Sequence, residues 1–386
     1  MKRTFFILGR TPTLAFLELQ SLYPSAVLLL SDVAVVSCEV DGKEVMHRLG
    51  GTVKIVRDVS EVPSVEPESV FRALLPYVSE GKISFGLSGY GSAHIPQSLY
   101  SAVKKLFVAR AVGVHYVESR HEDALSSVVV TKQHLTELVV IGLPHAYVLG
   151  ITSAVQDFEE WNTRDSARPA SDPKRGMLPP KVARMIVNIA LGEGDVKGKT
   201  LLDPFCGVGT VLAEAQMLGA QAVGFDIVED AVVKAQKNIA WLRAQYGLLQ
   251  QNAVHIATGD ATHVSEYIPI SSVDAIATEP FMGEQIRRPE GVKIPAHDAK
   301  NIIRGLEKLY IGCLKEWVNV LRPGGRVVMA MPAYVTDRGV MNVKKVVDRC
   351  EILGYTLLTG PIEYSRPQAI VRREFFVFQK RYFVTC

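Results

Sequence analysis

Hydrophobic positions in the second half of the chain alternate between short β-rich runs and longer runs with helical spacing. The β-rich runs are TLLDPF, AVGFD, VHIATGD, VDAIATE and RVVMAMP. Helical runs follow Gly209, extend from Glu229 to about Tyr246, and lead through Trp317. This alternation predicts a mostly parallel, doubly wound sheet covered by helices. Two further strand-like runs, YTLLTGPIEY and EFFVFQKRY, predict an antiparallel hairpin that closes the sheet.

Shorter apolar runs before this region predict two small α+β units. In the first unit, the runs TFFILG, VAVVSCEV and TVKIVRDV flank helical segments near Leu14–Leu22 and Lys43–Leu49. The second unit starts near Val65 and has a helix from about Gln97 to Val112. Its strand-like runs are ISFGLSGY, SSVVVTK, ELVVIG and YVLGIT.

A segment rich in charges and prolines, Asp157–Pro180, breaks the pattern and is predicted to be an ordered linker. Apolar residues then recur at helical spacing and predict an amphipathic helix, at Val182, Met185, Ile186, Ile189 and Ala190. We therefore expect four parts: an α+β domain at 1–64, a second at 65–152, a linker at 153–180 and the doubly wound domain at 181–386.

Composition excludes several classes of protein. With 48% hydrophobic and 22% charged residues, the chain is typical of globular proteins rather than disordered or fibrous ones. The five cysteines form no CxxC pair, so we expect neither a disulfide framework nor a metal site. The apolar run near the N-terminus is too short for a signal peptide or a membrane span, so we expect a cytoplasmic protein. We further expect a monomer or weak homo-oligomer. A net charge of +3 means that any nucleic-acid surface must come from local clusters of basic residues.

The sequence LLDPFCGVGT, at residues 201–210, predicts a cofactor-binding loop. A buried strand ends in Asp203 and turns through Gly207 and Gly209 into a helix. Glycines at these positions let the backbone turn tightly and approach a ligand, and the helix N-terminus behind them is rich in hydrogen-bond donors. The remaining predicted ligand-binding positions of this loop are Phe205, Cys206 and Thr210.

Two later strand ends supply further acidic residues. Asp226 lies 19 residues beyond Gly207, near the spacing expected of an acid that holds ribose hydroxyls, and Ile227 follows it. Asp260 and Ala261 follow the next strand, where they are placed to meet an adenine. The alternative is that these acids only cap helices, but three such sites in order favour a cofactor site.

The fourth strand end, ATEPFMGE, places Glu279 and Pro280 at the predicted catalytic position, and Glu279 is also a predicted cofactor contact. An exocyclic amine has its lone pair delocalised into the ring, so a carboxylate and a backbone carbonyl that accept its hydrogens orient it for reaction. Phe281 is the nearest candidate to stack on a flipped base. The alternative is a loop acid that pairs with Arg287 or Arg288.

Basic residues outnumber acidic ones by six to two between positions 164 and 184. These residues are Arg164, Arg168, Lys174, Arg175, Lys181 and Arg184. They form either a phosphate track or an ordinary solvated linker. Lys104 and Lys105 are further candidates for RNA contact, although the interleaved Tyr100 and Phe107 are more typical of a core.

The chain resembles the THUMP-containing tRNA guanine-N2 methyltransferases, which modify the guanine at position ten. The resemblance covers most of the chain. It rests on AVQDFEEWNTRDSARPASDPKRGMLPPKVARMIVNIA, joined to DPFCGVGT and followed by GFD, GDA and LRPGGRVV. It implies a Rossmann-like methyltransferase domain that binds S-adenosylmethionine. Before it would come a ferredoxin-like α+β domain and, from about Val65 to Gly150, an RNA-binding THUMP domain that grips tRNA.

The same resemblance implies roles for individual residues. Met177, Leu178 and Pro179 would line the methionine end of the cofactor. Asp203 and Gly207 would meet its amino and carboxyl groups, Asp226 its ribose and Asp260 its adenine.

The fourth strand end departs from the family pattern of an aspartate, two prolines and an aromatic residue. In one alignment Glu279 replaces the aspartate and Met282 takes the aromatic position. Shifted by one residue, Phe281 is the aromatic and Thr278 replaces the acid. The sequence predicts transfer of a methyl group to the N2 amine of a guanosine in tRNA. The alternatives are a non-catalytic RNA-binding protein that keeps the cofactor fold, and an amino-methyltransferase acting on DNA.

Overall fold

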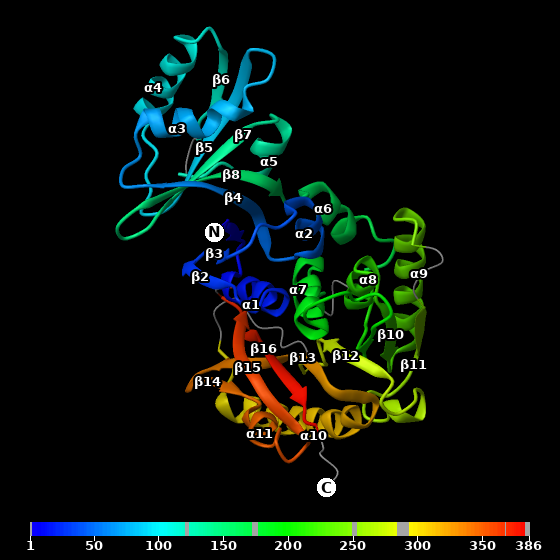
Figure 1. Cartoon of the computed structure of the whole chain (residues 1–386). Coiled ribbons are helices and arrows are strands. Elements are labelled where there is room, and N and C mark those ends of the chain that lie inside the picture. The colour runs from blue at the N-terminus through cyan, green and yellow to red at the C-terminus, as the bar shows by residue number, and fades with distance from the viewer. Residues whose placement is uncertain are drawn as a thin grey trace. The chain divides into compact units, whose positions relative to one another are not determined.

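The computed structural model describes residues 2–119, 123–171, 177–248, 253–283, 293–366 and 368–382. The chain divides into two compact units, Met1–Glu160 and Trp161–Cys386. Figure 1 shows the chain coloured from its N-terminus in blue to its C-terminus in red. Each unit is built around a sheet of eight strands, including one short strand in the second unit that pairs outside the main strand order.

The sheet of the first unit has the strand order β2-β3-β1-β4-β8-β7-β5-β6. Its strands are β1 Thr4–Leu8, β2 Val27–Leu30, β3 Val33–Val36, β4 Thr52–Val62, β5 Lys82–Gly91, β6 Gly113–Val117, β7 Thr136–Gly142 and β8 Tyr147–Val155. The long strand β4 pairs with β1 on one side and with β8 on the other. The sheet therefore runs without a break through both domains predicted at 1–64 and 65–152, and their boundary stays a prediction.

Five α-helices and a short 3-10 helix accompany this sheet in the described residues. They are α1 Pro12–Leu22, α2 Gly42–Arg48, α3 Pro67–Leu74, η1 Leu75–Tyr77, α4 Gln97–Val108 and α5 Ser127–Lys132. One core cluster of this unit joins α3 and α4 to the sheet through Phe71, Phe107 and Phe85. A buried ion pair of 2.5 Å links Lys54 on β4 to Glu137 on β7, across the strand β8 that lies between them.

The run SSVVVTK, predicted as a strand, forms the helix α5 instead. The side chain of Ser126 caps this helix by accepting a hydrogen bond of 3.3 Å from the backbone amide of Val129. Val130 then packs with Leu125 and Leu135 in a small cluster of buried residues. Local capping thus outweighs the strand preference of the β-branched residues.

The second unit contains the predicted doubly wound sheet, with the order β11-β10-β9-β12-β13-β16-β15 and β14 paired to β13. Its strands are β9 Thr200–Asp203, β10 Gln221–Asp226, β11 Val254–Thr258, β12 Val273–Thr278, β13 Leu321–Thr336, β14 Gly339–Asn342, β15 Tyr355–Tyr364 and β16 Val371–Lys380. Neighbours from β11 to β13 are parallel. The strands β15 and β16 form the predicted antiparallel hairpin, and β16 pairs antiparallel with β13.

Helices lie on both faces of this sheet; Figure 1 shows α7 and α8 on one side and α10 and α11 on the other. The helices are α6 Phe158–Ser166, α7 Pro180–Leu191, α8 Thr210–Met217, α9 Glu229–Gln245, η2 Val264–Glu266, α10 Ala296–Val320 and α11 Lys344–Asp348. The α10 face of the core centres on Trp317, Tyr310 and Leu314, which are fully buried. In the described part of the chain, no helix is both long and apolar enough to cross a membrane.

Candidate functional site

The carboxyl ends of β9, β10, β11 and β12 meet at one edge of the second sheet. Strand β9 lies between β10 and β12, so the chain order reverses beside it. Such a switch point is where open α/β sheets bind ligands, because the loops on its two sides turn away from each other. The loops that follow these strands contain the acidic residues singled out from the sequence.

The loop after β9 takes the conformation expected of a cofactor loop. Gly207 and Gly209 both have left-handed backbones, with φ of +52° and +86°. A Cβ on Gly209 would lie 3.2 Å from the Cβ of Ala235, whereas one on Gly207 would meet nothing within 4 Å. The amide of Cys206 is tied to the carbonyl of Phe225 at 2.8 Å. The loop is therefore packed against its neighbours at Gly209 and open at Gly207.

Asp203 is a buried acid with few partners. Thr278 donates a hydrogen bond of 2.6 Å to its carboxylate, and the amide of Phe205 donates one of 3.2 Å. Burial raises the pKa of Asp203 to about 7, although both hydrogen bonds act in the opposite direction. A cationic ligand group beside this carboxylate would remove much of the cost of ionising it.

Asp226 is fixed at the end of β10 by two backbone amides. The amide of Gly207 donates to its Oδ2 at 3.0 Å, and the amide of Val228 donates to its Oδ1 at 2.9 Å. Asp226 therefore joins the cofactor loop to the next strand end. The side chain of the following residue, Ile227, is 71% exposed, so it is free to contact a planar ligand.

Asp260 turns toward its own loop in the structure. The amide and hydroxyl of Thr262 each donate a hydrogen bond of 2.8 Å to its Oδ1. These bonds lower the pKa of Asp260, and His263 adds a weaker effect in the same direction. The carbonyl of Ala261 accepts a hydrogen bond of 2.9 Å from the indole of Trp317, which anchors this loop to α10.

Arg168 lies at the N-terminus of α8 rather than in an open basic track. Its Nη1 donates a hydrogen bond of 2.9 Å to the hydroxyl of Thr210, the first residue of that helix. The side chain is only 6% exposed, and its nearest carboxylate, on Asp165, is 3.6 Å away. Burial lowers the pKa of Arg168, and its Nε has no hydrogen-bond partner. A buried cation beside a helix N-terminus favours an anionic ligand group.

Glu279 follows β12 and is mostly buried. Its carboxylate accepts a hydrogen bond from the guanidinium of Arg373, which belongs to β16. Burial raises the pKa of Glu279, and the charge of Arg373 acts against this shift. The alternative partners Arg287 and Arg288 lie outside the described residues.

The backbone after Glu279 is held from two sides. Tyr310 donates a hydrogen bond of 2.7 Å to the carbonyl of Phe281, and Tyr334 donates one of 2.5 Å to the carbonyl of Met282. The side chain of Phe281 is 54% exposed, while Pro280 is buried. The hydroxyl of Thr278 is engaged by Asp203, so Glu279 is the carboxylate at this strand end, and its catalytic role stays a prediction.

The segment Met177, Leu178 and Pro179 comes directly before α7. Leu178 is buried, and its two neighbours are partly exposed. Helix α7 packs against α8 and against β12, the two elements that carry the cofactor loop and Glu279. The structure thus attaches this segment to the same domain, and its cofactor contact stays a prediction.

The predicted phosphate track requires correction. The guanidinium of Arg164 is 3% exposed and pairs with Glu214 at 2.9 Å, while Arg184 pairs with the same carboxylate at 2.7 Å. These two arginines hold α6 and α7 to α8 and are not available to phosphate. Arg168 is also buried, as described above. Lys174 and Arg175 lie outside the described residues.

The basic residues of α4 are exposed, as an RNA contact requires. Lys104 and Lys105 both face solvent, and the ammonium of Lys104 lies 5.6 Å from the ring centre of Tyr116. Tyr100 and Phe107 are buried in the core of the first unit, as the alternative interpretation expected. Only the lysines therefore remain as candidates on this helix.

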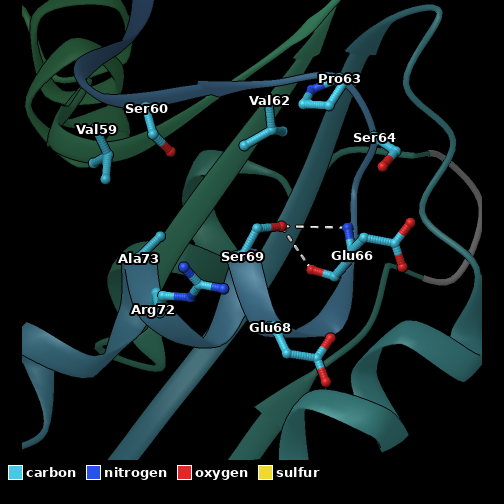
Figure 2. Close-up of a pocket in the computed structure, with 10 residues that line it drawn as sticks. All are labelled: Val59, Ser60, Val62, Pro63, Ser64, Glu66, Glu68, Ser69, Arg72 and Ala73. Carbon is cyan, nitrogen blue, oxygen red and sulfur yellow. Dashed lines mark hydrogen bonds between the residues drawn. The ribbon is translucent and has the colours of Figure 1, made fainter.

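A cavity of about 570 Å³ opens in the first unit between the end of β4 and the start of α3, as Figure 2 shows. The hydroxyl of Ser69 donates a hydrogen bond of 2.7 Å to the carbonyl of Glu66 and accepts one of 3.2 Å from the amide of Glu66. Glu66 and Glu68 outnumber Arg72 among the charged lining residues. This acidic balance does not suit RNA phosphates. Among the residues described, no cluster of histidine, cysteine and acidic side chains fits a metal ion.

Comparison with known proteins agrees with this geometry. Residues 168–351 match the family described as RMKL-like, methyltransferase domain. The chain is 29% identical over 226 residues to a tRNA (guanine(10)-N2)-dimethyltransferase from Pyrococcus abyssi, covering 58% of this chain and 56% of the relative. It is 32% identical over 190 residues to one from Methanothermobacter thermautotrophicus, covering 49% of this chain and 48% of the relative. The chain thus spans about half the length of these relatives.

Among solved structures, TrmN from Thermus thermophilus has a similar fold along the whole chain. The TM-score is 0.53 at 20% identity, and the match covers 98% of this chain and 100% of the other. Together with the family match, this likeness confirms the prediction of a Rossmann-like methyltransferase fold in the second unit.

Proposed function

We propose that the methyltransferase domain matched at residues 168–351 uses S-adenosylmethionine to methylate the exocyclic N2 amine of a guanosine in tRNA. The observation that carries the proposal is the set of acids at successive strand ends of one sheet edge. Asp203 and Asp226 border the cofactor loop, and Glu279 follows β12, the other neighbour of β9 in the sheet, beside an exposed aromatic residue. The names of the two archaeal relatives support the choice of substrate.

The charged groups around the loop fit the amino-acid end of S-adenosylmethionine. The buried carboxylate of Asp203, with its pKa of about 7, suits the cofactor's ammonium group. The buried guanidinium of Arg168, at the N-terminus of α8, suits its carboxylate. We therefore assign Arg168 to the cofactor site and no longer to the RNA contacts. The open space at Gly207 leaves room for a ligand above the loop.

The remaining cofactor contacts follow the strand order. Asp226, at the end of β10, is assigned to the ribose, and the exposed Ile227 beside it to one face of the adenine. Asp260 and Ala261, after β11, are assigned to the edge of the adenine. Because Thr262 already donates hydrogen bonds to the carboxylate of Asp260, we assign the adenine contact either to the remaining lone pairs of that carboxylate or to the backbone of the loop.

Bound S-adenosylmethionine supplies a methyl group, which bonds to the amine nitrogen as the carbon–sulfur bond breaks and its electron pair stays on sulfur. The role of Glu279 is to accept hydrogens of the amine and orient its lone pair. The buried Pro280 fixes the backbone behind it, and Phe281 offers its exposed ring to the face of the flipped guanine. The surplus proton on the methylated nitrogen passes to the Glu279 carboxylate and then to water.

The first unit is proposed to bind the tRNA. Residues 65–152 are assigned to a THUMP domain and residues 1–64 to a ferredoxin-like domain, with Lys104 and Lys105 contacting phosphates. The exposure of both lysines supports this assignment. We further expect the protein to act in the cytoplasm, as a monomer or weak homo-oligomer.

Transfer of labelled methyl groups to total tRNA tests the proposed function. The wild-type protein should label tRNA, and Glu279→Ala should lose at least about a hundredfold in kcat, since it removes an oriented acceptor. Cofactor binding by Glu279→Ala, measured by calorimetry, should stay within about twofold. Cofactor binding by the wild-type protein without any transfer to RNA would favour the non-catalytic RNA-binding protein instead.

A further inference from the structure

Arg373 is the charged residue closest to the proposed catalytic acid, and no sequence motif singled it out. Its Nε donates a hydrogen bond to Oε1 of Glu279. The two side chains are 28% and 17% exposed, so water screens the pair only partly. Within the described residues, no group donates a hydrogen bond to Oε2 of Glu279.

Sheet topology explains how Arg373 reaches the ligand edge. Thr278 at the end of β12 lies opposite Met329 on β13, and Met329 lies opposite Phe376 on β16. Because β16 is antiparallel to β13, its first residues extend past the end of β12. Arg373 accordingly lies opposite Pro332, three residues beyond Met329 on β13. The closing hairpin thus places the guanidinium-bearing residue Arg373 at the edge where the parallel strands end.

The groups around Glu279 come from several elements and differ in charge. Arg373 on β16 is the cation. Asp203 after β9, Tyr310 on α10 and Tyr364 on β15 also interact electrostatically with the Glu279 carboxylate. Burial favours the neutral form of Glu279 and raises its pKa, and Arg373 is the group that favours the charged form.

We propose that Arg373 is a positioning residue that holds Oε1 of Glu279 and so presents Oε2 to the amine that receives the methyl group. The inference rests on the function proposed above. A glutamate has one more rotatable bond than the aspartate of the family pattern, so its carboxylate needs a partner to stay in one place. The planar guanidinium fixes both the position and the plane of that carboxylate. Arg373 thereby lets a longer acid serve in this site.

The neighbouring Arg372 provides a matched control. Successive side chains on a strand point to opposite faces, and Arg372 pairs with Glu363 at 3.4 Å instead. Its side chain is 31% exposed, against 28% for Arg373. Replacing either arginine by glutamine therefore removes one partly buried charge from the same strand, but only Arg373→Gln releases Glu279.

Steady-state kinetics with S-adenosylmethionine and tRNA tests the proposal. Arg373→Gln should lower kcat at least about tenfold with little change in KM for the cofactor, since it disturbs the reacting groups and not cofactor binding. The acid limb of its pH–rate profile should move to higher pH, because burial then acts on Glu279 without an opposing charge. Arg373→Lys should recover part of the rate, and Arg372→Gln should match the wild type.

A measurement that does not need turnover separates this proposal from the function on which it rests. Infrared difference spectra between the wild type and Glu279→Gln report whether the Glu279 carboxyl group is ionised at each pH. The same subtraction in the Arg373→Gln background should show ionisation at higher pH, with thermal unfolding confirming a folded protein. Equal titration in the two backgrounds, or an unchanged kcat and pH profile in Arg373→Gln, would overturn the positioning role. Failure of the wild type to methylate any RNA would count against the proposed function alone.

Discussion

Among single residues, the site combines acids that the sequence assigns to it with two arginines, Arg168 and Arg373, that the sequence does not assign to it. Asp203, Asp226 and Glu279 stand at strand ends in recognisable motifs. Arg373 lies 94 residues from Glu279, and Arg168 lies 42 residues from Thr210. No local pattern connects partners at such separations, because the sheet and the packing of α8 bring them together. Arg164 and Arg168 were predicted to belong to a phosphate track because the sequence does not show that their side chains are buried.

Asp203 makes cofactor binding sensitive to pH. In the proposed site the ammonium of S-adenosylmethionine would bind the charged carboxylate, and a proton would compete with it below the pKa of about 7. Affinity should therefore fall about tenfold for each pH unit below that value and level off above it. Calorimetric titration between about pH 5.5 and about pH 8, from roughly 1.5 units below the pKa of about 7 to roughly 1 unit above it, checks this.

Two variants separate that effect from general weakening. Asp203→Asn should bind the cofactor weakly with no dependence on pH in this range. Arg168→Ala should bind weakly at every pH but keep the dependence, since the carboxylate of Asp203 is unchanged. A wild-type affinity that stays constant across the range would contradict the assignment of Asp203 to the ammonium group.

At the scale of secondary-structure elements, strands of the second unit are predictable because parallel strands covered on both faces read as continuous apolar runs. The runs predicted for β9 to β13 and for the closing hairpin all form strands. In the first unit the six-residue helix α5 was wrongly predicted as a strand, and the helix α3 and the two edge strands, β2 and β6, were not predicted. Helix α5 depends on one serine cap, and the two edge strands have side chains that are exposed or only partly buried.

The linker element α6 is predicted to depend on one buried carboxylate. Glu214 pairs with both Arg164 and Arg184, and the guanidinium of Arg164 also lies 4.0 Å from the ring centre of Trp161. Glu214→Gln would leave two buried guanidinium groups without their anion and should destabilise the protein by about 3–5 kcal/mol. Urea denaturation measures the change.

A surface acid on the next helix serves as the control for Glu214. Asp230 pairs with Lys234 at 2.7 Å, but its side chain is 73% exposed. Asp230→Asn should change stability by less than about 0.5 kcal/mol. Equal losses in Glu214→Gln and Asp230→Asn would show that the buried cluster has no special role in holding α6.

At the scale of the whole molecule, the chain consists of two units with separate sheets, and we assign chemistry to the second and tRNA binding to the first. The doubly wound architecture and its closing hairpin followed from the sequence. The continuous eight-stranded sheet of the first unit did not, because strand β4 joins two segments that looked like separate domains. Pairing between distant strands leaves no signal in a single sequence.

If the first unit binds tRNA and the second binds the cofactor, the lysines of α4 should affect tRNA binding and not cofactor binding. Replacing both Lys104 and Lys105 by glutamate should weaken tRNA binding at least about tenfold and reduce the dependence of affinity on salt, since fewer phosphates are neutralised. Cofactor affinity should not change. Lys43→Glu, an exposed charge reversal on α2, is the control. Filter binding over a range of salt concentrations measures these effects, and unchanged binding by the double variant would exclude α4 from the tRNA interface.

The most direct test of the central claim is the identity of the methylated atom. A tRNA transcript is incubated with the protein and isotopically labelled S-adenosylmethionine, and its nucleosides are separated by mass spectrometry. A matched transcript carries inosine, which lacks the N2 amine, in place of the guanosine at position ten. We expect labelled N2-methylguanosine from the first transcript, none at that position from the second, and none from either with Glu279→Ala. Label on another nucleoside, or equal labelling by Glu279→Ala, would contradict the central claim.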